Sequence, residues 1–266
     1  MAAKADRHEL YELSVQAPDV DAATLARLFK RYRKRHAVSL REDFCGTAVL
    51  STAWVQSREG RTAVGIDLDQ PTMDWGMDNR VQPAGVADRV TLLRANVLDG
   101  AGPKVDVAAG LNFSYNVLHE RAQLVEYFRA SRRTLVDDGL LILDLFGGWG
   151  TMWPETNRRE VEGEGEREGF TYRWEQRHFD PLTHRIVCVI AFDFPDGSRI
   201  EDAFYYEWRL WTCPEIRDAL DEAGFSRVRV LWERTDDDGD GTGKFYEPKK
   251  HVDNQESFWT YIVAER

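Results

Sequence analysis

Short apolar runs alternate with longer amphipathic segments over the first half of the chain. The runs have the length and residue types of buried strands, and they cover residues 38–42, 62–66, 90–95, 105–111 and 140–145. The amphipathic segments have apolar residues three or four positions apart, as in helices, and they cover residues 21–35, 48–57, 72–81 and 121–135. Because strands and helices take turns, we expect a parallel sheet with helices on both faces.

The pattern changes after residue 147. Strand-like segments at residues 170–179, 185–194 and 199–211 follow one another with short turns between them, which predicts an antiparallel insert. A helix at residues 214–222, then strands at 225–233 and 258–264, close the chain. We therefore expect a helical cap, a core, the insert, and a closing helix with its strands. These regions span residues 1–36, 37–150, 151–212 and 213–266.

Composition narrows the choice of partner. The chain has 266 residues, 42% of them hydrophobic, which favours a sizeable core in one large domain or in one domain with an elaborated cap. Its formal net charge of −11 argues against nucleic acid, because nucleic-acid binders usually carry a basic surface. We interpret the basic run at residues 30–35 as the solvated end of a helix, where positive charge is favoured.

The expected location is the cytoplasm. Cys45, Cys188 and Cys213 are widely spaced and include no C-x-x-C pair, so neither a disulfide framework nor a zinc site is expected. No apolar run reaches the roughly 18 residues of a membrane span. The N-terminal residues lack the apolar core of a signal peptide.

Residues 40–69 carry the strongest chemical signal. They are predicted to form a strand, the turn Cys45-Gly46-Thr47, a helix, and a second strand that ends at Asp67. The helix N-terminus offers free N–H groups, and a strand-end carboxylate accepts hydrogen bonds from a ribose diol. Gly46 and Asp67 are separated by close to the roughly 20 residues expected between such a turn and its ribose carboxylate. This stretch therefore predicts a nucleotide-binding crevice.

The motifs LREDFCGTA, GIDLD and RANVLD, at residues 40–48, 65–69 and 94–99, resemble those of class I S-adenosylmethionine-dependent methyltransferases. The resemblance covers roughly residues 40–146 and the two closing strands. It implies an α/β fold: a doubly wound, seven-stranded, mostly parallel Rossmann-like sheet whose last strand runs antiparallel, here with the antiparallel β insert as acceptor cap. It also implies in-line methyl transfer from S-adenosyl-L-methionine to an acceptor.

The resemblance assigns donor contacts residue by residue. Glu42 takes the acidic position before the turn, in competition with Asp43, and Gly46 takes the middle glycine position. Phe44 and Ala48 replace the outer glycines. The implied cofactor-binding residues are Tyr11, Glu42, Phe44, Cys45, Gly46, Thr47, Asp67, Leu68, Asn96, Val97 and Asn112.

Some of these donor contacts have alternatives. Leu68 is expected beside the adenine, and Asn96 and Val97 at its edge, with Asp99 as a second candidate. Tyr11, together with Gln16, is expected to close the crevice from an N-terminal helix. Plain packing of that helix on the core is an equal alternative.

The candidate catalytic residues are Asn112, Tyr115 and His119. Asn112 to Tyr115 loosely resemble the [DN]-P-P-[YF] loop of amino-group methyltransferases, but both prolines are missing. We interpret Asn112 and Tyr115 as lining the donor and acceptor pocket, with a structural turn as the alternative. His119 is either a packing residue or a general base, since its ordinary pKa lies near 6.5.

Aromatic residues of the insert and its entry are the candidates for acceptor binding. Trp149, Tyr206 and Trp208 suit an amine or apolar acceptor through cation–π contact. The alternative is that a small sheet needs large side chains for its core.

An Asp/Gly-rich stretch at residues 235–247 matches calcium-loop spacing, but its flanks are not helices. A mobile lid is therefore favoured, and no metal is expected.

We therefore expect a cytoplasmic methyltransferase for a small-molecule acceptor, with an amine preferred and homo-oligomerisation open. A nicotinamide-dependent oxidoreductase is an alternative, but residues 45–48 lack the glycines of G-x-G-x-x-G. A nucleic-acid or protein methyltransferase and a non-catalytic donor-binding protein are the others.

Overall fold

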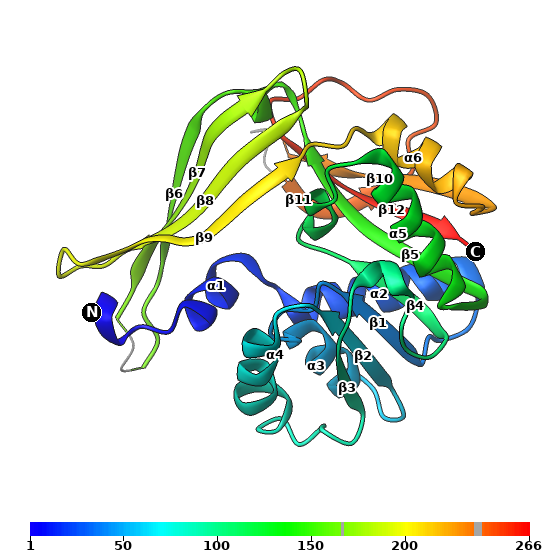
Figure 1. The fold of residues 1–266 in the computed structure, drawn as a ribbon, viewed down its shortest axis with the longest axis horizontal. Helices are drawn as coiled ribbons and strands as arrows, with labels where there is room; N and C mark the ends of the chain where they lie inside the picture. Colours follow the sequence, from blue (N-terminus) through cyan, green and yellow to red (C-terminus); the bar gives the residue numbers. More distant parts are fainter. Residues whose placement is uncertain (166–167, 237–240) are drawn as a thin grey trace.

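The computed structural model describes every residue except 166–167 and 237–240. Its main sheet has eight strands in the order β11-β10-β12-β5-β4-β1-β2-β3 (Figure 1). In chain order these strands are β1 (Ser39–Asp43), β2 (Thr62–Asp67), β3 (Val90–Arg94), β4 (Val105–Gly110), β5 (Leu135–Gly147), β10 (Arg227–Thr235), β11 (Gly241–Tyr246) and β12 (Phe258–Glu265).

Strand directions confirm the predicted mostly parallel sheet, but it has eight strands rather than seven because β11 pairs with β10 at its edge. β1 pairs in parallel with β2 and β4, and the parallel pairing continues to β3 and β5. β12 lies antiparallel between β5 and β10. The carboxyl ends of β1, β2 and β4 therefore meet at one edge of the sheet, where ligands bind in doubly wound folds.

Helices cover both faces, as the alternation of elements predicts. The hydrophobic core on one face contains Phe29 and Trp54 from α2 and α3. The core on the opposite face contains Phe128 and Leu220 from α5 and α6. The main helices are α1 (Arg7–Val15), α2 (Pro18–Arg33), α3 (Val49–Gln56), α4 (Gln70–Gly76), α5 (Arg121–Arg133) and α6 (Cys213–Glu222). Short helical turns are η1 (Ala2–Lys4), η2 (Met77–Val81), η3 (Val97–Asp99), η4 (Ser114–Val117) and η5 (Trp149–Met152).

The insert forms a separate antiparallel sheet, as expected, with one strand more than predicted. Its strands are β6 (Glu155–Val161), β7 (Phe170–Asp180), β8 (Arg185–Asp193) and β9 (Arg199–Arg209). β6 escaped prediction because its sequence, ETNRREV, has almost no apolar residues and is mostly exposed. β6 is held by its pairing with β7, and this long-range contact cannot be read from the sequence of β6 alone.

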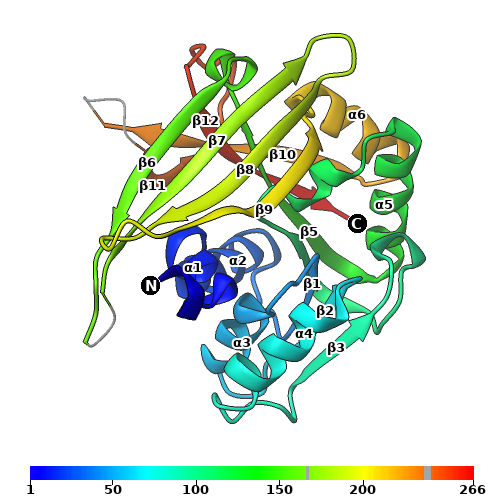
Figure 2. The ribbon, with the colours of Figure 1, turned by 60° about the vertical axis from the view of Figure 1, so that its left-hand side comes forward.

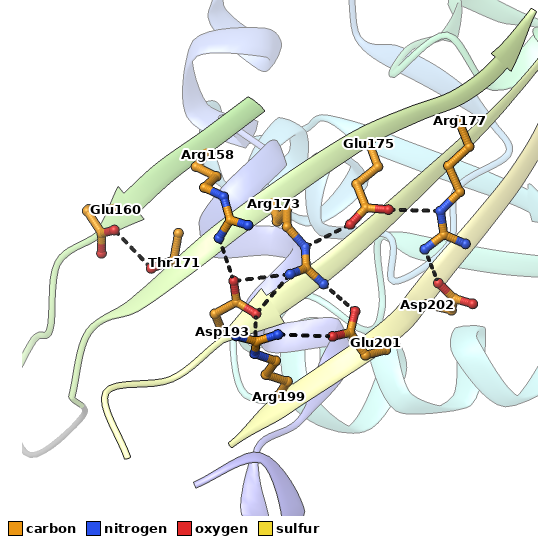
Figure 3. A network of polar contacts seen from close by, with 10 residues as sticks. All are labelled: Arg158, Glu160, Thr171, Arg173, Glu175, Arg177, Asp193, Arg199, Glu201 and Asp202. Carbon is orange, nitrogen blue, oxygen red and sulfur yellow. Dashed lines mark hydrogen bonds and ion pairs between the residues drawn. The ribbon is translucent and has the colours of Figure 1, made fainter. Parts of the chain in front are cut away.

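The two faces of this second sheet differ in chemistry. On one face, Arg173 contacts Glu175, Asp193 and Glu201, and Arg177 contacts Asp202 at 2.5 Å (Figure 3). Because successive residues of a strand point to opposite sides, Tyr172, Trp174 and Gln176 face the other way. The charged face is turned to solvent, and the aromatic face is turned toward the rest of the molecule.

The stretch at residues 235–247 corrects an expectation. Instead of a lid without secondary structure, it contains β11, which pairs with β10. Phe245 packs on Trp259 and Tyr261 at ring distances of 5.3 and 4.8 Å, which fixes the strand. The calcium-spacing residues Asp237, Asp238, Gly239 and Asp240 lie outside the described residues, and the described part of the chain contains no cluster of metal-ligating side chains.

The basic run near the end of α2 lies at the surface, as the sequence analysis predicts. The basic end of α2 is solvated and ion-paired: Arg33 binds Glu265, and Arg35 binds Asp106 and Asp138. The three cysteines are unpaired. Within the described ranges, no helix is long and apolar enough to cross a membrane.

Candidate functional site

The turn after β1 alternates between ordinary and left-handed backbone. Phe44, Gly46 and Ala48 have φ of 59°, 50° and 56°. This conformation costs roughly 1–2 kcal/mol for a residue with a side chain, whereas glycine adopts it freely. Phe44 and Ala48 thus hold a glycine-like backbone at the two outer motif positions. The turn therefore keeps a left-handed backbone at all three motif positions, although two of its glycines are replaced.

The competition between Glu42 and Asp43 is resolved by their partners. The Asp43 carboxylate binds Arg41 at 2.7 Å, and all three charged side chains of this strand end are buried. The Glu42 carboxylate instead accepts hydrogen bonds from the backbone N–H of Ser51 at 2.9 Å and from its hydroxyl at 2.5 Å. Burial raises the pKa of Glu42 to about 8. Glu42, which has no cation beside it, is therefore the carboxyl group suited to a positively charged ligand.

Asp67 lies at the end of β2, beside the turn. Its carboxylate accepts hydrogen bonds from the backbone N–H of Gly46 and of Asp69, each at 2.9 Å. These two bonds orient the carboxylate and leave lone pairs for a diol. The turn also packs closely on α4, because a Cβ on Gly76 would lie 2.2 Å from the carbonyl oxygen of Thr47.

The expected adenine contacts lie at neighbouring strand ends. Asp67 is paired with Arg94, so the residues after β2 and β3 are adjacent. Leu68 is 61% exposed, Val97 is buried, and the Asn96 side chain accepts a hydrogen bond from the N–H of Leu98. Their contact with adenine stays a prediction.

Helix α1 lies over the turn, between the second sheet and α4 (Figures 1 and 2). The two Glu12 carboxylate oxygens accept hydrogen bonds from the Thr47 hydroxyl and from Arg80, both at 2.5 Å. Tyr11 does not face the turn: it lines a larger cavity and packs on Phe204 at 4.8 Å. The N-terminal segment thus contacts the turn through Glu12, which the sequence analysis missed. Closure of the crevice over a donor stays a prediction.

A small cavity runs from α1 to the ends of β1 and β4. Gln16, Asp21, Glu42, Phe44 and Asn112 are among the residues that line it. The Gln16 side-chain oxygen is buried and has no hydrogen-bond partner among the described residues. A ligand donating a hydrogen bond there would satisfy it.

A cavity of about 900 Å³ lies between the second sheet and the ends of β4, β5 and β12. Aromatic side chains dominate its wall, among them Tyr172, Trp174, Tyr206, Trp208 and Trp259. Its charged lining residues are all carboxylates, Glu155, Glu233 and Glu256, with no lysine or arginine among the described lining residues. An aromatic wall with negative charge favours a cationic guest.

Asn112 lines both the small and the large cavity. Asn112 and Phe113 have φ of 55° and 57°, two successive left-handed residues that carry side chains. Their backbone N–H groups donate to the two oxygens of Asp144 at 2.8 and 2.9 Å. Burial raises the pKa of Asp144 to about 7. The turn that presents Asn112 is therefore strained and anchored on one carboxylate.

The structure corrects the expected placement of Tyr115 and His119. Tyr115 is fully buried, and its hydroxyl donates to the Asp144 carbonyl oxygen at 2.6 Å. The His119 ring contacts the Glu207 carbonyl oxygen at 2.7 Å and does not line the cavity. Tyr115 thus bonds to β5 within the core, and His119 joins the segment before α5 to β9. This geometry supports a packing role for His119 and gives no support for catalysis by either residue.

Two of the three predicted acceptor residues line the large cavity, and the third does not. Tyr206 and Trp208 line the large cavity and stack at 4.6 Å, with Trp174 at 6.2 and 5.9 Å from them. Trp149 is half-exposed on η5, and its neighbours Gly150 and Thr151 line the cavity in its place. The role of Trp149 in acceptor binding stays a prediction without support from the lining.

Other lining residues were not predicted from the sequence. Tyr172, Trp174 and Gln176 alternate along β7, and this period of two was a usable signal. Glu233, Glu256 and Trp259 belong to β10 and the entry to β12. Only the folded arrangement brings them to the cavity.

A scan against protein-family models finds no match, and no curated protein sequence matches significantly. Solved structures do match. DesVI of Streptomyces venezuelae is 15% identical, with a TM-score of 0.70 and 98% of each chain covered. An S-adenosylmethionine-bound amino pentose methyltransferase of calicheamicin biosynthesis, from Micromonospora echinaspora, is 15% identical, with a TM-score of 0.69 and coverages of 97% and 95%.

A sugar N-methyltransferase from a Streptoalloteichus species is 19% identical, with a TM-score of 0.66 and coverages of 98% and 93%. At these identities the likeness concerns the fold. The chain has the Rossmann-like methyltransferase fold over nearly its whole length, second sheet included.

Proposed function

We propose that this protein is an S-adenosylmethionine-dependent methyltransferase that acts on an amino group of a small-molecule acceptor. The observation that carries the proposal is the position of Asn112, which belongs both to the small cavity beside the donor turn and to the 900 Å³ cavity under the second sheet. Methyl transfer needs two ligands to meet end to end. Asn112 stands between the large cavity and the strand ends that carry the donor turn, where the small cavity leaves only about 20 Å³ of space.

The residues of the donor site fit S-adenosylmethionine. The Gly46 turn and the Asp67 carboxylate suit a ribose diol, and Glu42 suits a positively charged donor. The unpartnered Gln16 oxygen suits a ligand N–H or O–H. Here the donor supplies an electrophilic methyl group, so the protein has to bind, align and exclude water rather than form covalent bonds.

The acceptor cavity supports an amine. Glu155, Glu233 and Glu256 attract an ammonium group, and the aromatic wall adds cation–π contact of about 0.5–2 kcal/mol. An amine attacks only as the free base, so it must lose a proton before the transfer. In the reaction the nitrogen lone pair forms the N–CH₃ bond while the S–CH₃ bond breaks. Two of the structural neighbours bear names of sugar or amino pentose methyltransferases, so an amino sugar is the first acceptor to test.

The alternatives have less support. A nicotinamide-dependent oxidoreductase needs glycines that let the pyrophosphate approach, but Phe44 and Ala48 occupy the outer turn positions. A nucleic-acid methyltransferase is disfavoured by the net charge of −11 and by the acidic cavity. A non-catalytic donor-binding protein remains an alternative that turnover decides.

A panel of acceptors tests the proposal. Labelled S-adenosylmethionine is incubated with the protein and with amino sugars, simple amines and phenols. Label transferred to amino sugars or amines in preference to phenols is the expected result. No transfer to any member, despite donor binding, would leave the non-catalytic alternative. The proposal includes a cytoplasmic location, to which the three unpaired cysteines are suited, and cell fractionation tests it. It also includes homo-oligomerisation, which sedimentation tests.

A further inference from the structure

The backbone turn at Asn112 and Phe113 needs contacts from other residues to stabilise it. Each residue has a left-handed backbone, which costs roughly 1–2 kcal/mol for a residue with a Cβ. Such strain persists only where the surroundings determine it. Two successive left-handed residues also direct their N–H groups to one point, where they form a small anion-binding concavity.

The Asp144 carboxylate occupies that point. One oxygen accepts from the N–H of Asn112 at 2.8 Å and the other from the N–H of Phe113 at 2.9 Å. The main-chain oxygen of Asp144 accepts from the Tyr115 hydroxyl at 2.6 Å. Asp144 is 4% exposed, and no ion pair with a lysine, arginine or histidine is found for it in the described part of the chain. One residue of β5 thus fastens both ends of the turn, and backbone dipoles balance its charge.

The turn presents Asn112, which lines both the small and the large cavity. The Asn112 side chain makes no hydrogen bond to another described residue, so it is free for ligand. Resting on the proposed function, we propose that Asp144 is a positioning residue for methyl transfer, whose ionised carboxylate holds Asn112 at the meeting point of donor and acceptor. Protonation of Asp144 replaces one accepting oxygen with a hydroxyl group and releases one of the two amides.

The hold is expected to respond to pH. The titratable groups that face Asp144 are Tyr11 of α1, Asp21 of α2, Tyr115 of η4 and Tyr261 of β12. Burial raises the pKa of Asp21 to about 6, and the three tyrosines have pKa values raised above their ordinary one, so none of the tyrosines ionises near neutral pH. Asp144 and Asp21 influence each other and titrate close together. Loss of the transition in Asp144→Asn, and not its midpoint, therefore assigns it to Asp144.

Two measurements on the full chain test the proposal. In ligand-free protein, the amide signals of Asn112 and Phe113 should shift together with a midpoint near pH 7. Asp144→Asn should abolish that transition. If these amide signals do not respond to pH, Asp144 does not hold the turn. This result is independent of activity, because the measurement needs neither donor nor acceptor. An absence of methyl transfer by the wild-type chain would count against the proposed function alone.

Turnover tests the positioning role. With an acceptor identified in the panel, Asp144→Asn should lower kcat at least tenfold at pH 8 and change donor Kd less than threefold, because the Gly46 and Asp67 contacts are untouched. The ratio of wild-type to variant kcat should shrink as the pH falls below 7, and this ratio cancels the ionisation of the acceptor. A ratio near one at pH 8 would overturn the proposal.

A matched control separates positioning from stability. Thr260 is fully buried on β12, and its hydroxyl donates to the Leu231 carbonyl oxygen at 2.6 Å without lining the cavity. Thr260→Val removes a buried hydrogen bond on a neighbouring strand, so it should lower Tm and leave kcat unchanged. A similar loss of kcat in both variants would show a general effect of destabilisation and would contradict the positioning role.

Discussion

The Thr47 hydroxyl donates a 2.5 Å hydrogen bond to the Glu12 carboxylate, across 35 positions of sequence. Through this bond α1 is attached to the turn that follows β1. The other oxygen of Glu12 accepts from Arg80, so one side chain joins the cap, the turn and the segment after α4. The cap over the crevice is therefore fastened by polar contacts that water or a ligand can replace.

Glu12→Gln should loosen this cap. The amide keeps one acceptor and loses the charge that binds Arg80, so hydrogen exchange in α1 should become faster and donor affinity should fall several-fold. Glu9→Gln is the matched control, because Glu9 lies exposed on the same helix and its side chain makes no hydrogen bond to another described residue. Equal behaviour of the two variants would contradict the role of Glu12.

Trp208→Leu should weaken acceptor binding and spare donor binding. The indole stacks on Tyr206 in the cavity wall, and loss of cation–π contact of about 1–2 kcal/mol corresponds to a rise in KM of about tenfold. Tyr205→Leu is the control, since Tyr205 points to the opposite face of β9 and is 53% exposed. Steady-state kinetics with an amine decide; an unchanged KM for Trp208→Leu would remove this residue from the acceptor site.

The stability of the ligand-free protein should increase as the pH falls from 9 to 6.5. Burial raises the pKa of Glu42 from 4.5 to about 8 and that of Asp144 from 3.8 to about 7. In the unfolded chain both groups are ionised throughout this range, so the folded state binds more protons as the pH falls and gains stability. Thermal melts should show Tm rising over this interval, with a smaller rise in Glu42→Gln. A Tm that falls over the same interval would contradict the burial of these charges.

Local pattern was enough to predict the crevice. Asp67 ends the strand that contains the apolar run at residues 63–66, and Gly46 follows the strand-like segment at residues 38–42, so their positions at parallel strand ends could be read from the sequence. The choice between Glu42 and Asp43 could not. Alternation places the two on opposite faces of β1, but only the folded partners, Arg41 for one and Ser51 for the other, show which carboxyl group lacks a counter-ion.

Contacts between distant segments escaped prediction. Tyr115 lies in the loop after β4, which suggested a pocket residue, yet its side chain turns to the carbonyl oxygen of Asp144 in the core. β11 was missed because its first four residues, Gly241 to Lys244, are polar or glycine, and Phe245 gains its packing from β12. The acidic lining by Glu233 and Glu256 depends on the same closing strands.

Calorimetric titration of the wild-type chain and of Asp67→Ala with S-adenosylmethionine, its demethylated product and NAD tests the central claim most directly. Wild type should bind the first two at one site and not NAD. Asp67→Ala should lose at least tenfold in affinity, because charge-assisted hydrogen bonds contribute about 1.5–3 kcal/mol each, while Tm changes little. Binding of NAD alone, or equal affinity of both chains for S-adenosylmethionine, would contradict the account.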